Sequence, residues 1–261
     1  MTEKRRRRQI VREFGVPIAG EILEPAQWTQ TALKRLPEPG PLDWERLFGR
    51  HAPRIVDIGC GNGHFLLGSA VWRPSHDHLG IDPLPVVIRY ATRRANQRGL
   101  TNIRFAVIDG LAFLMKYAEP ASLHEIHCYH PQPFYDEGQI HRRLITPEFL
   151  ALVHRTLVPD GTFFLQTDNP GYWQYMQRVV PVFFDWQVRI GTWPDAPKGR
   201  TRREILALRR GLPVHRGFGT PRPGLESAEA LRLAAGLPPP TFDADRRLQE
   251  LDKLERDVGD K

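Results

Sequence analysis

The stretch Arg54-Ile55-Val56-Asp57-Ile58-Gly59-Cys60-Gly61-Asn62-Gly63 decides the fold of this chain. Its first five residues are mostly apolar and β-branched, which is typical of a short buried strand. The alternating glycines that follow predict a tight turn whose backbone a ligand can approach closely. A helical pattern from Asn62 to Trp72 completes a strand-turn-helix unit, and in open α/β sheets such a turn lies at the ligand-binding edge.

The same alternation of strands and helices continues along the chain. We predict seven strands, at Arg54–Ile58, His78–Asp82, Asn102–Ile108, Leu123–Tyr129, Thr162–Thr167, Trp186–Thr192 and Leu212–Phe218. We predict helices between the first five of them and after the fifth, at Asn62–Trp72, Leu84–Arg98, Leu111–Tyr117, Pro147–Leu157 and Tyr172–Phe183. This order indicates a Rossmann-like α/β fold: a mostly parallel seven-stranded sheet with helices on both faces. The last two strands have no predicted helix between them, so we expect an antiparallel pair at one edge.

The flanks of this region differ from it in composition. Residues 1–50 predict a basic arm followed by short helices, at Trp28–Arg35 and Asp43–Phe48. Residues 51–219 form the predicted domain. Residues 220–261 are rich in proline and charge, so we expect a mobile tail with one short helix at Asp243–Asp257.

Composition excludes several classes of protein. The chain has 261 residues, 41% of them hydrophobic, which is enough for a core. No apolar run approaches the length of a membrane helix, no secretory signal follows the charged N-terminus, and two cysteines cannot build a disulfide framework. We therefore expect a cytoplasmic protein without a membrane partner.

The net charge of +7 is unevenly distributed. Residues 1–12 carry +5 and residues 141–219 carry +6, whereas each of the other two segments carries −2. Arginine suits phosphate recognition, so we expect the arm and the arginines of residues 200–216 to contact a polyanion. Solvated surface charge is the alternative interpretation for the arm.

Three carboxylates follow three successive predicted strands: Asp57, Asp82 and Asp109. A dinucleotide fold prefers the spacing G-x-G-x-x-G, whereas Gly59, Gly61 and Gly63 alternate, and a carboxylate beside them would repel a pyrophosphate. The set instead suits a cationic amino group, ribose hydroxyls and an adenine amine, which together describe S-adenosylmethionine. The alternative is that Asp82 and Asp109 are only helix N-caps.

The loop after the fourth predicted strand reads Pro131-Gln132-Pro133-Phe134-Tyr135. Its prolines stiffen the chain and its aromatic side chains can stack on a flat substrate. Nearby His124, His127, Cys128 and His130 suggest a metal site. We expect none, because residues 124 and 127 of a strand point to opposite faces, as do 127 and 130.

Taken together, the motifs resemble the bacterial tRNA (guanine-N7)-methyltransferase family over about residues 54–214. The motifs that carry the resemblance are Asp57–Gly63, Gly80-Ile81-Asp82, Asp109, Pro131-x-Pro133, Arg142-Arg143, Pro147-Glu148-Phe149, Thr167-Asp168, and Thr201-x-x-Glu204 with Arg209 and Gly211. The resemblance implies a class I methyltransferase with S-adenosylmethionine as donor and a guanine of tRNA as acceptor.

The resemblance also implies roles for particular residues. The cofactor would be held by Asp57, Gly59, Gly61, Gly63, Asp82 and Asp109. The guanine and its RNA would be contacted by Asp168, Thr201, Glu204, Arg142 and Arg143, and Gln132 stands at the position of the family's catalytic aspartate.

The sequence departs from the family on the substrate side. The family loop reads Pro-Asp-Pro-Trp, whereas this chain has Gln132 for the aspartate and Phe134 for the tryptophan. Guanine N7 has a lone pair and no proton to lose, so methyl transfer needs positioning rather than a strong base. Losing a charge-assisted hydrogen bond costs about 1–3 kcal/mol, or roughly 5- to 150-fold in rate. Asp136 and Glu137 replace part of the family's basic run and would repel phosphate.

Two other functions stay open from the sequence. One is a methyltransferase for a small molecule or a protein side chain, and the other is a tRNA-binding protein whose catalysis is weakened by Gln132. Neither the base and position modified nor the choice between monomer and homodimer follows from the sequence.

Overall fold

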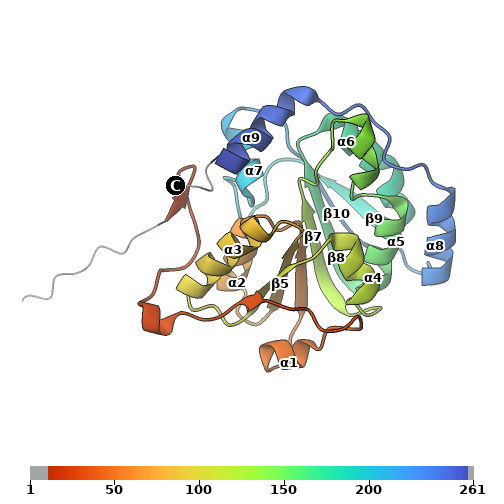
Figure 1. The fold of residues 1–261 in the computed structure, drawn as a ribbon. Helices are drawn as coiled ribbons and strands as arrows, with labels where there is room; N and C mark the ends of the chain where they lie inside the picture. The colour runs from red at the N-terminus through yellow and green to blue at the C-terminus, as the bar shows by residue number, and fades with distance from the viewer. Residues whose placement is uncertain (1–10, 258–261) are drawn as a thin grey trace, which may run out of the picture.

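The computed structural model describes residues 11–257 and has an eight-stranded sheet at its centre (Figure 1). The strand order is β3-β6-β5-β4-β7-β8-β10-β9. In chain order the strands are β3 (Ala32–Leu33), β4 (Arg54–Ile58), β5 (Asp77–Asp82), β6 (Ile103–Val107), β7 (Leu123–Tyr129), β8 (Leu157–Thr167), β9 (Phe184–Arg189) and β10 (His215–Pro221). The first six are parallel, and β10 is antiparallel to both of its neighbours. The predicted mostly parallel sheet with an antiparallel pair at one edge is confirmed.

The strand count of seven was wrong, because β3 adds an edge strand beside β6. It comes from residues 28–35, for which we predicted a helix. The backbone oxygen of Thr31 accepts a hydrogen bond from the Phe105 nitrogen, and the Thr31 nitrogen donates to Asn96 Oδ1, both at 2.9 Å. These two bonds, one to β6 and one to Asn96 in the helix before β6, hold the segment extended. Farther on, α1 (Trp44–Phe48) forms a short helix whose N-cap is Asp43.

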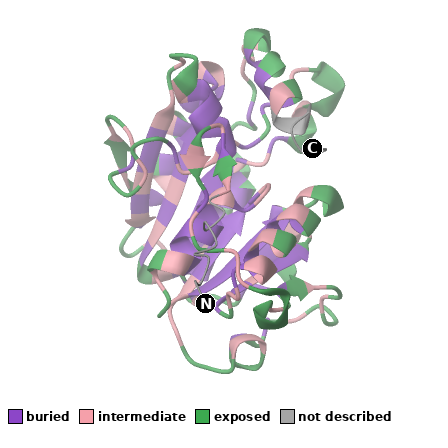
Figure 2. Ribbon diagram, turned by 90° about the vertical axis from the view of Figure 1, so that its left-hand side faces the viewer, coloured by how far each residue is buried: buried purple, intermediate pink, exposed green. Residues whose placement is uncertain are grey.

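Helices cover both faces of the sheet. They are α2 (His64–Trp72), α3 (Pro85–Gln97), α4 (Gly110–Lys116), α5 (Pro147–Thr156), α6 (Pro170–Val179) and α8 (Ser227–Gly236). In Figure 1, α2 and α3 lie on one side of the strands and the other four lie on the opposite side. Side chains of β4 divide between the two layers, because Val56 and Ile58 join one buried cluster and Ile55 joins the other. Figure 2 shows the resulting central band of buried strands.

A helix that we did not predict lies between the last two strands. The structure has α7 (Arg202–Arg209) between β9 and β10, and its N-cap Thr201 accepts a hydrogen bond from the Glu204 nitrogen at 3.1 Å. The motif Thr201-x-x-Glu204 is thus a helix start, and β10 begins three residues later than we expected.

The C-terminal segment packs on the domain in place of the predicted mobile tail. Strand β10 continues to Pro221, and α8 buries Ala230 against the layer that contains α5. The last helix, α9 (Gln249–Asp257), buries Leu251 beside α7. The arginine run at residues 5–8 and residues 258–261 lie outside the described part of the chain. Within residues 11–257 no helix is long and apolar enough to cross a bilayer.

Candidate cofactor and substrate site

The glycine turn after β4 has the geometry that its sequence predicts. Gly59, Gly61 and Gly63 all have positive φ angles, of 76°, 53° and 76°. A Cβ atom built on Gly59 or Gly61 would meet nothing within 4 Å, so open space lies beside the turn. On Gly63 the same atom would lie 2.9 Å from Ala91 Cβ, which shows that this glycine permits α2 and α3 to pack closely. The first two glycines thus leave room for a ligand, and the third serves packing.

Asp57 presents a buried carboxyl beside this open space. The residue is 3% exposed, and its side chain has no hydrogen-bond donor or cation in contact within the described chain. Burial, together with the nearby charge of Asp82, raises the pKa of Asp57 to about 8. A buried carboxyl without a partner costs free energy, so this one is suited to a ligand that brings a positive charge or hydrogen-bond donors.

Asp82 ends β5, next to β4 in the sheet. Its Oδ2 atom accepts a hydrogen bond from the Gly61 nitrogen at 3.1 Å, and its Oδ1 atom accepts one from the Leu84 nitrogen at 2.9 Å. Burial raises its pKa, although these two backbone bonds act in the opposite direction. Asp82 therefore braces the glycine turn at the same edge of the sheet.

Asp109 follows β6, the next strand along, and is exposed. Its Oδ1 atom accepts a hydrogen bond from the Ala112 nitrogen at 3.0 Å, which caps α4. The N-cap interpretation thus explains one oxygen of Asp109. Because β4, β5 and β6 are adjacent and parallel, the three predicted cofactor carboxylates meet at one edge.

The proline loop, residues 130–135, follows β7 at the same edge. His130 and Phe134 both have positive φ angles, of 51° and 39°, which are rare for residues with a side chain. Gln132 lies between them and is exposed. The Arg142 guanidinium lies 4.8 Å from the centre of the Phe134 ring, at the surface.

Arg143, predicted to contact the substrate, is instead 3% exposed and bonded within the protein. It donates to the carbonyl oxygens of Pro133 at 2.6 Å and Phe134 at 2.9 Å. It also donates to the carbonyl oxygens of Pro240 at 2.7 Å and Phe242 at 3.1 Å. The structure therefore places Arg143 beneath the proline loop as a support.

Asp168, directly after β8, is 5% exposed and lies between two basic side chains. Arg203 Nε donates to its Oδ2 atom at 2.7 Å, and His130 Nδ1 lies 3.3 Å from its Oδ1 atom. Burial alone would raise the pKa of Asp168, but the hydrogen bond with His130 and the charge and hydrogen bond of Arg203 outweigh it and hold the pKa well below its usual range. Asp168 is thus a permanent carboxylate at the end of the strand next to the proline loop.

Gln166 connects His130 to Glu204. Its Oε1 atom accepts a hydrogen bond from Trp193 Nε1 at 2.7 Å, which fixes the orientation of the amide. Its Nε2 atom then donates to His130 Nε2 at 3.0 Å and to Glu204 Oε2 at 3.2 Å. His130 must accept through Nε2, so its Nδ1 atom carries the proton toward Asp168.

Glu204 is fully buried and has no free oxygen. Arg216 donates two hydrogen bonds to its Oε1 atom, one of them from Nε at 2.8 Å, and the Arg200 nitrogen donates to its Oε2 atom at 2.7 Å. The structure brings Asp168 and Glu204 into one network, but this network is satisfied from within the protein.

Three of the arginines that we expected to contact phosphates are instead buried within the protein. Arg202, Arg203 and Arg216 are 7%, 5% and 3% exposed and pair with buried carboxylates. Arg209 and Arg210 are exposed. Sequence reasoning missed this because charge counts do not tell a paired arginine from a free one. The sequence of α7, in which Arg202-Arg203-Glu204 directly precedes four apolar residues, was the available signal.

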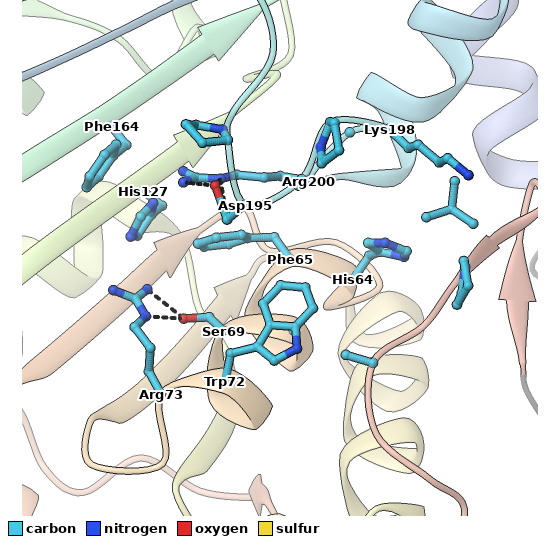
Figure 3. Close-up of a pocket in the computed structure, with 18 of the residues that line it drawn as sticks. His64, Phe65, Ser69, Trp72, Arg73, His127, Phe164, Asp195, Lys198 and Arg200 are labelled. Atoms are coloured by element: carbon cyan, nitrogen blue, oxygen red, sulfur yellow. Dashed lines mark hydrogen bonds and ion pairs between the residues drawn. The ribbon is translucent and has the colours of Figure 1, made fainter.

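Figure 3 shows a further pocket, of about 600 Å³, along the side of α2. The labelled residues that line it are His64, Phe65, Ser69, Trp72, Arg73, His127, Phe164, Asp195, Lys198 and Arg200. None of the residues predicted to bind the cofactor or the guanine is among its lining. Its carboxylates are already paired, Glu125 with Arg73 at 2.6 Å and Asp195 with Arg200 at 2.7 Å. The glycine turn, where Asp57 has no partner among residues 11–257, is the better place for a cationic ligand.

His127 lines this pocket. Its ring stacks on Phe164 with centres 4.5 Å apart, and its Nε2 atom lies 2.9 Å from Glu125 Oε2. Among residues 11–257 no three His, Cys, Asp or Glu side chains are grouped to hold an ion.

Comparisons with known proteins agree with this architecture. A family described as "Putative methyltransferase" matches residues 51–213. A protein of Alkalilimnicola ehrlichii named tRNA (guanine-N(7)-)-methyltransferase is 34% identical over 81% of this chain and 89% of its own length. One of the same name from Halorhodospira halophila is 32% identical over 82% and 95%. Among solved structures, the 16S rRNA methyltransferase KamB superposes with a TM-score of 0.55 at 16% identity, covering 74% of this chain and 99% of that one.

The sheet order, the glycine turn and the carboxylates at three neighbouring strand ends define a class I methyltransferase. At 34% identity over most of both chains, the particular family is also fixed. This chain belongs to the tRNA (guanine-N7)-methyltransferase family.

Proposed function

We propose that this protein transfers a methyl group from S-adenosylmethionine to N7 of a guanine in tRNA. The observation that carries the proposal is the buried carboxyl of Asp57, which has no partner in the described part of the chain and lies beside an open glycine turn, in a chain of this family. The relatives are bacterial proteins named for tRNA, so the proposal also places the reaction in the cytoplasm.

The residues present fit this cofactor, which supplies an electrophilic methyl group when bound. Asp57 would accept hydrogen bonds from its ammonium group, and the open backbone at Gly59 and Gly61 would allow close approach. Asp82 would accept from the ribose hydroxyls and the free oxygen of Asp109 from the adenine amine. Each of the three carboxylates can thus accept hydrogen bonds from a different group of the cofactor.

On the substrate side the residues position the base rather than deprotonate it. Guanine N7 already has a lone pair, so the protein must orient the ring and exclude alternative poses. The exposed Gln132 amide can accept a hydrogen bond from the N–H groups of guanine, without the charge that an aspartate would add. Asp168 stays ionised next to the loop and provides negative potential toward the same edge.

Exposed arginines are available for the RNA backbone. Arg142 lies at the proline loop, and Arg209 and Arg210 end α7. The arginine run at residues 5–8 is a further candidate for contact with the RNA backbone.

The test is a transfer assay with isotope-labelled S-adenosylmethionine and total tRNA. We expect label in the RNA fraction, and we expect Asp57→Asn to remove most of it. Label in protein or small molecules instead would support the other methyltransferase classes. RNA binding without label, restored by Gln132→Asp, would identify a tRNA-binding protein with weakened catalysis.

A further inference from the structure

The segment Pro238–Leu254, here named the C-terminal strap, runs across the substrate edge of the sheet. It passes the first turn of α6 so closely that a Cβ on Gly171 would lie 2.4 Å from the Asp243 oxygen. The Tyr175 hydroxyl donates to the Pro238 oxygen at 3.0 Å. The strap is therefore seated on the domain along its length.

The strap contacts the proline loop through Arg143 and Phe242. Arg143 joins the carbonyls of Pro133 and Phe134 to those of Pro240 and Phe242. Its guanidinium lies 3.6 Å from the centre of the Phe242 ring, which stacks on Tyr172 at 4.5 Å. Arg246 adds a bond to the Tyr135 oxygen at 3.3 Å. A loop with two residues at positive φ keeps its shape only where its surroundings impose it, and these contacts do so.

The strap is also connected to Asp168, through the side chain of Arg203. Arg203, whose Nε atom holds Asp168, donates through Nη1 to Asp252 on α9 and through Nη2 to the Leu248 oxygen at 3.2 Å. Leu248 and Leu251 bury themselves with Leu206 of α7 in a small separate cluster. Asp252 thus fixes the guanidinium that orients Asp168.

We propose that the C-terminal strap is a working part of the substrate site, in which Phe242 and Asp252 are positioning residues for the proline loop and for Asp168. This inference rests on the proposed function for its activity readout. It assigns a role in substrate positioning to a segment that lies beyond the family match at residues 51–213. Because the glycine turn makes none of these contacts, cofactor binding should be independent of the strap.

The test compares Phe242→Ala and Asp252→Asn with Glu250→Gln. Glu250 is exposed on the same helix as Asp252, so its variant removes the same charge without touching Arg203. We expect both strap variants to lower kcat for tRNA methylation by about tenfold or more, with the Kd of S-adenosylmethionine within twofold of the wild type. Glu250→Gln should match the wild type in both. Unchanged kcat in the strap variants, or an equal loss of cofactor affinity, would overturn the inference.

Hydrogen exchange gives a readout that needs no activity. Amides of residues 130–136 should exchange faster in Phe242→Ala than in the wild type, whereas amides of residues 58–63 should not change. Equal exchange of the loop in both proteins overturns the inference even if the wild type proves inactive on tRNA. A wild type without transfer, by contrast, overturns the proposed function alone.

Discussion

At the scale of single residues, the distinction that matters is between carboxylates with partners and those without. Glu204 and Asp168 are held by arginines, whereas Asp57 is buried with no donor or cation in contact within the described chain. A folded protein tolerates a buried carboxyl without a partner when a bound ligand supplies the missing hydrogen bonds or positive charge. Of these three carboxylates, Asp57 is therefore the one that a ligand can pair with.

Asp57→Asn should therefore separate stability from binding. With a pKa of about 8 in the fold against 3.8 in the unfolded chain, Asp57 keeps a proton that the unfolded chain loses, so its contribution to stability falls as pH rises from about 4 to 8. The variant without cofactor should melt a few degrees higher than the wild type at pH 8, with the gap closing toward pH 4. Its Kd for S-adenosylmethionine should rise about 10- to 100-fold. Calorimetry measures both, and a lower Tm at pH 8 would contradict this account.

At the scale of elements, the sequence predicts the repeating strand-turn-helix units better than the elements that depart from this repeat. The strand-turn-helix unit at residues 54–72 follows from β-branched residues and glycines, and it forms as predicted. The edge strand β3 was missed because its two residues are fixed by bonds from Thr31 to β6 and Asn96, which no local pattern encodes. Among the candidate site residues, Asp57 and the glycines are placed by local geometry. The burial of Arg143 was not predictable, because two of its four carbonyl partners lie about 100 positions away in the strap.

Helix α7 offers a test of how Thr201 acts. Its hydroxyl caps the helix that carries Arg203 and Glu204. Thr201→Ala should cost about 1 kcal/mol of stability, or roughly 2–4 °C in Tm for a chain of this size. Thr201→Ser keeps the cap and should have the Tm and the methylation activity of the wild type. Thermal melts and the transfer assay decide this. An unchanged Tm in Thr201→Ala would rule out a capping role.

At the scale of the whole molecule, the net charge of +7 is less available to RNA than its total suggests. Arg202, Arg203 and Arg216 pair with internal carboxylates. Of the arginines at residues 200–216, Arg209 and Arg210 at the end of α7 are the exposed ones. RNA binding should accordingly depend on few side chains.

Replacing both Arg209 and Arg210 with glutamine should weaken tRNA binding and reduce the slope of log Kd against log salt concentration by about 1–2. Arg232→Gln, an exposed arginine on α8, is the matched control and should leave the slope unchanged. Filter binding at several salt concentrations measures the slope. Equal slopes for the double variant and the control would place the RNA elsewhere.

The most direct test of the central claim is nucleoside mass spectrometry of tRNA after incubation with the purified protein and S-adenosylmethionine. The tRNA should come from cells that lack 7-methylguanosine. The account predicts that 7-methylguanosine appears with the wild type and is nearly absent with Asp57→Asn. Tight cofactor binding without any methylated nucleoside in the tRNA would contradict it.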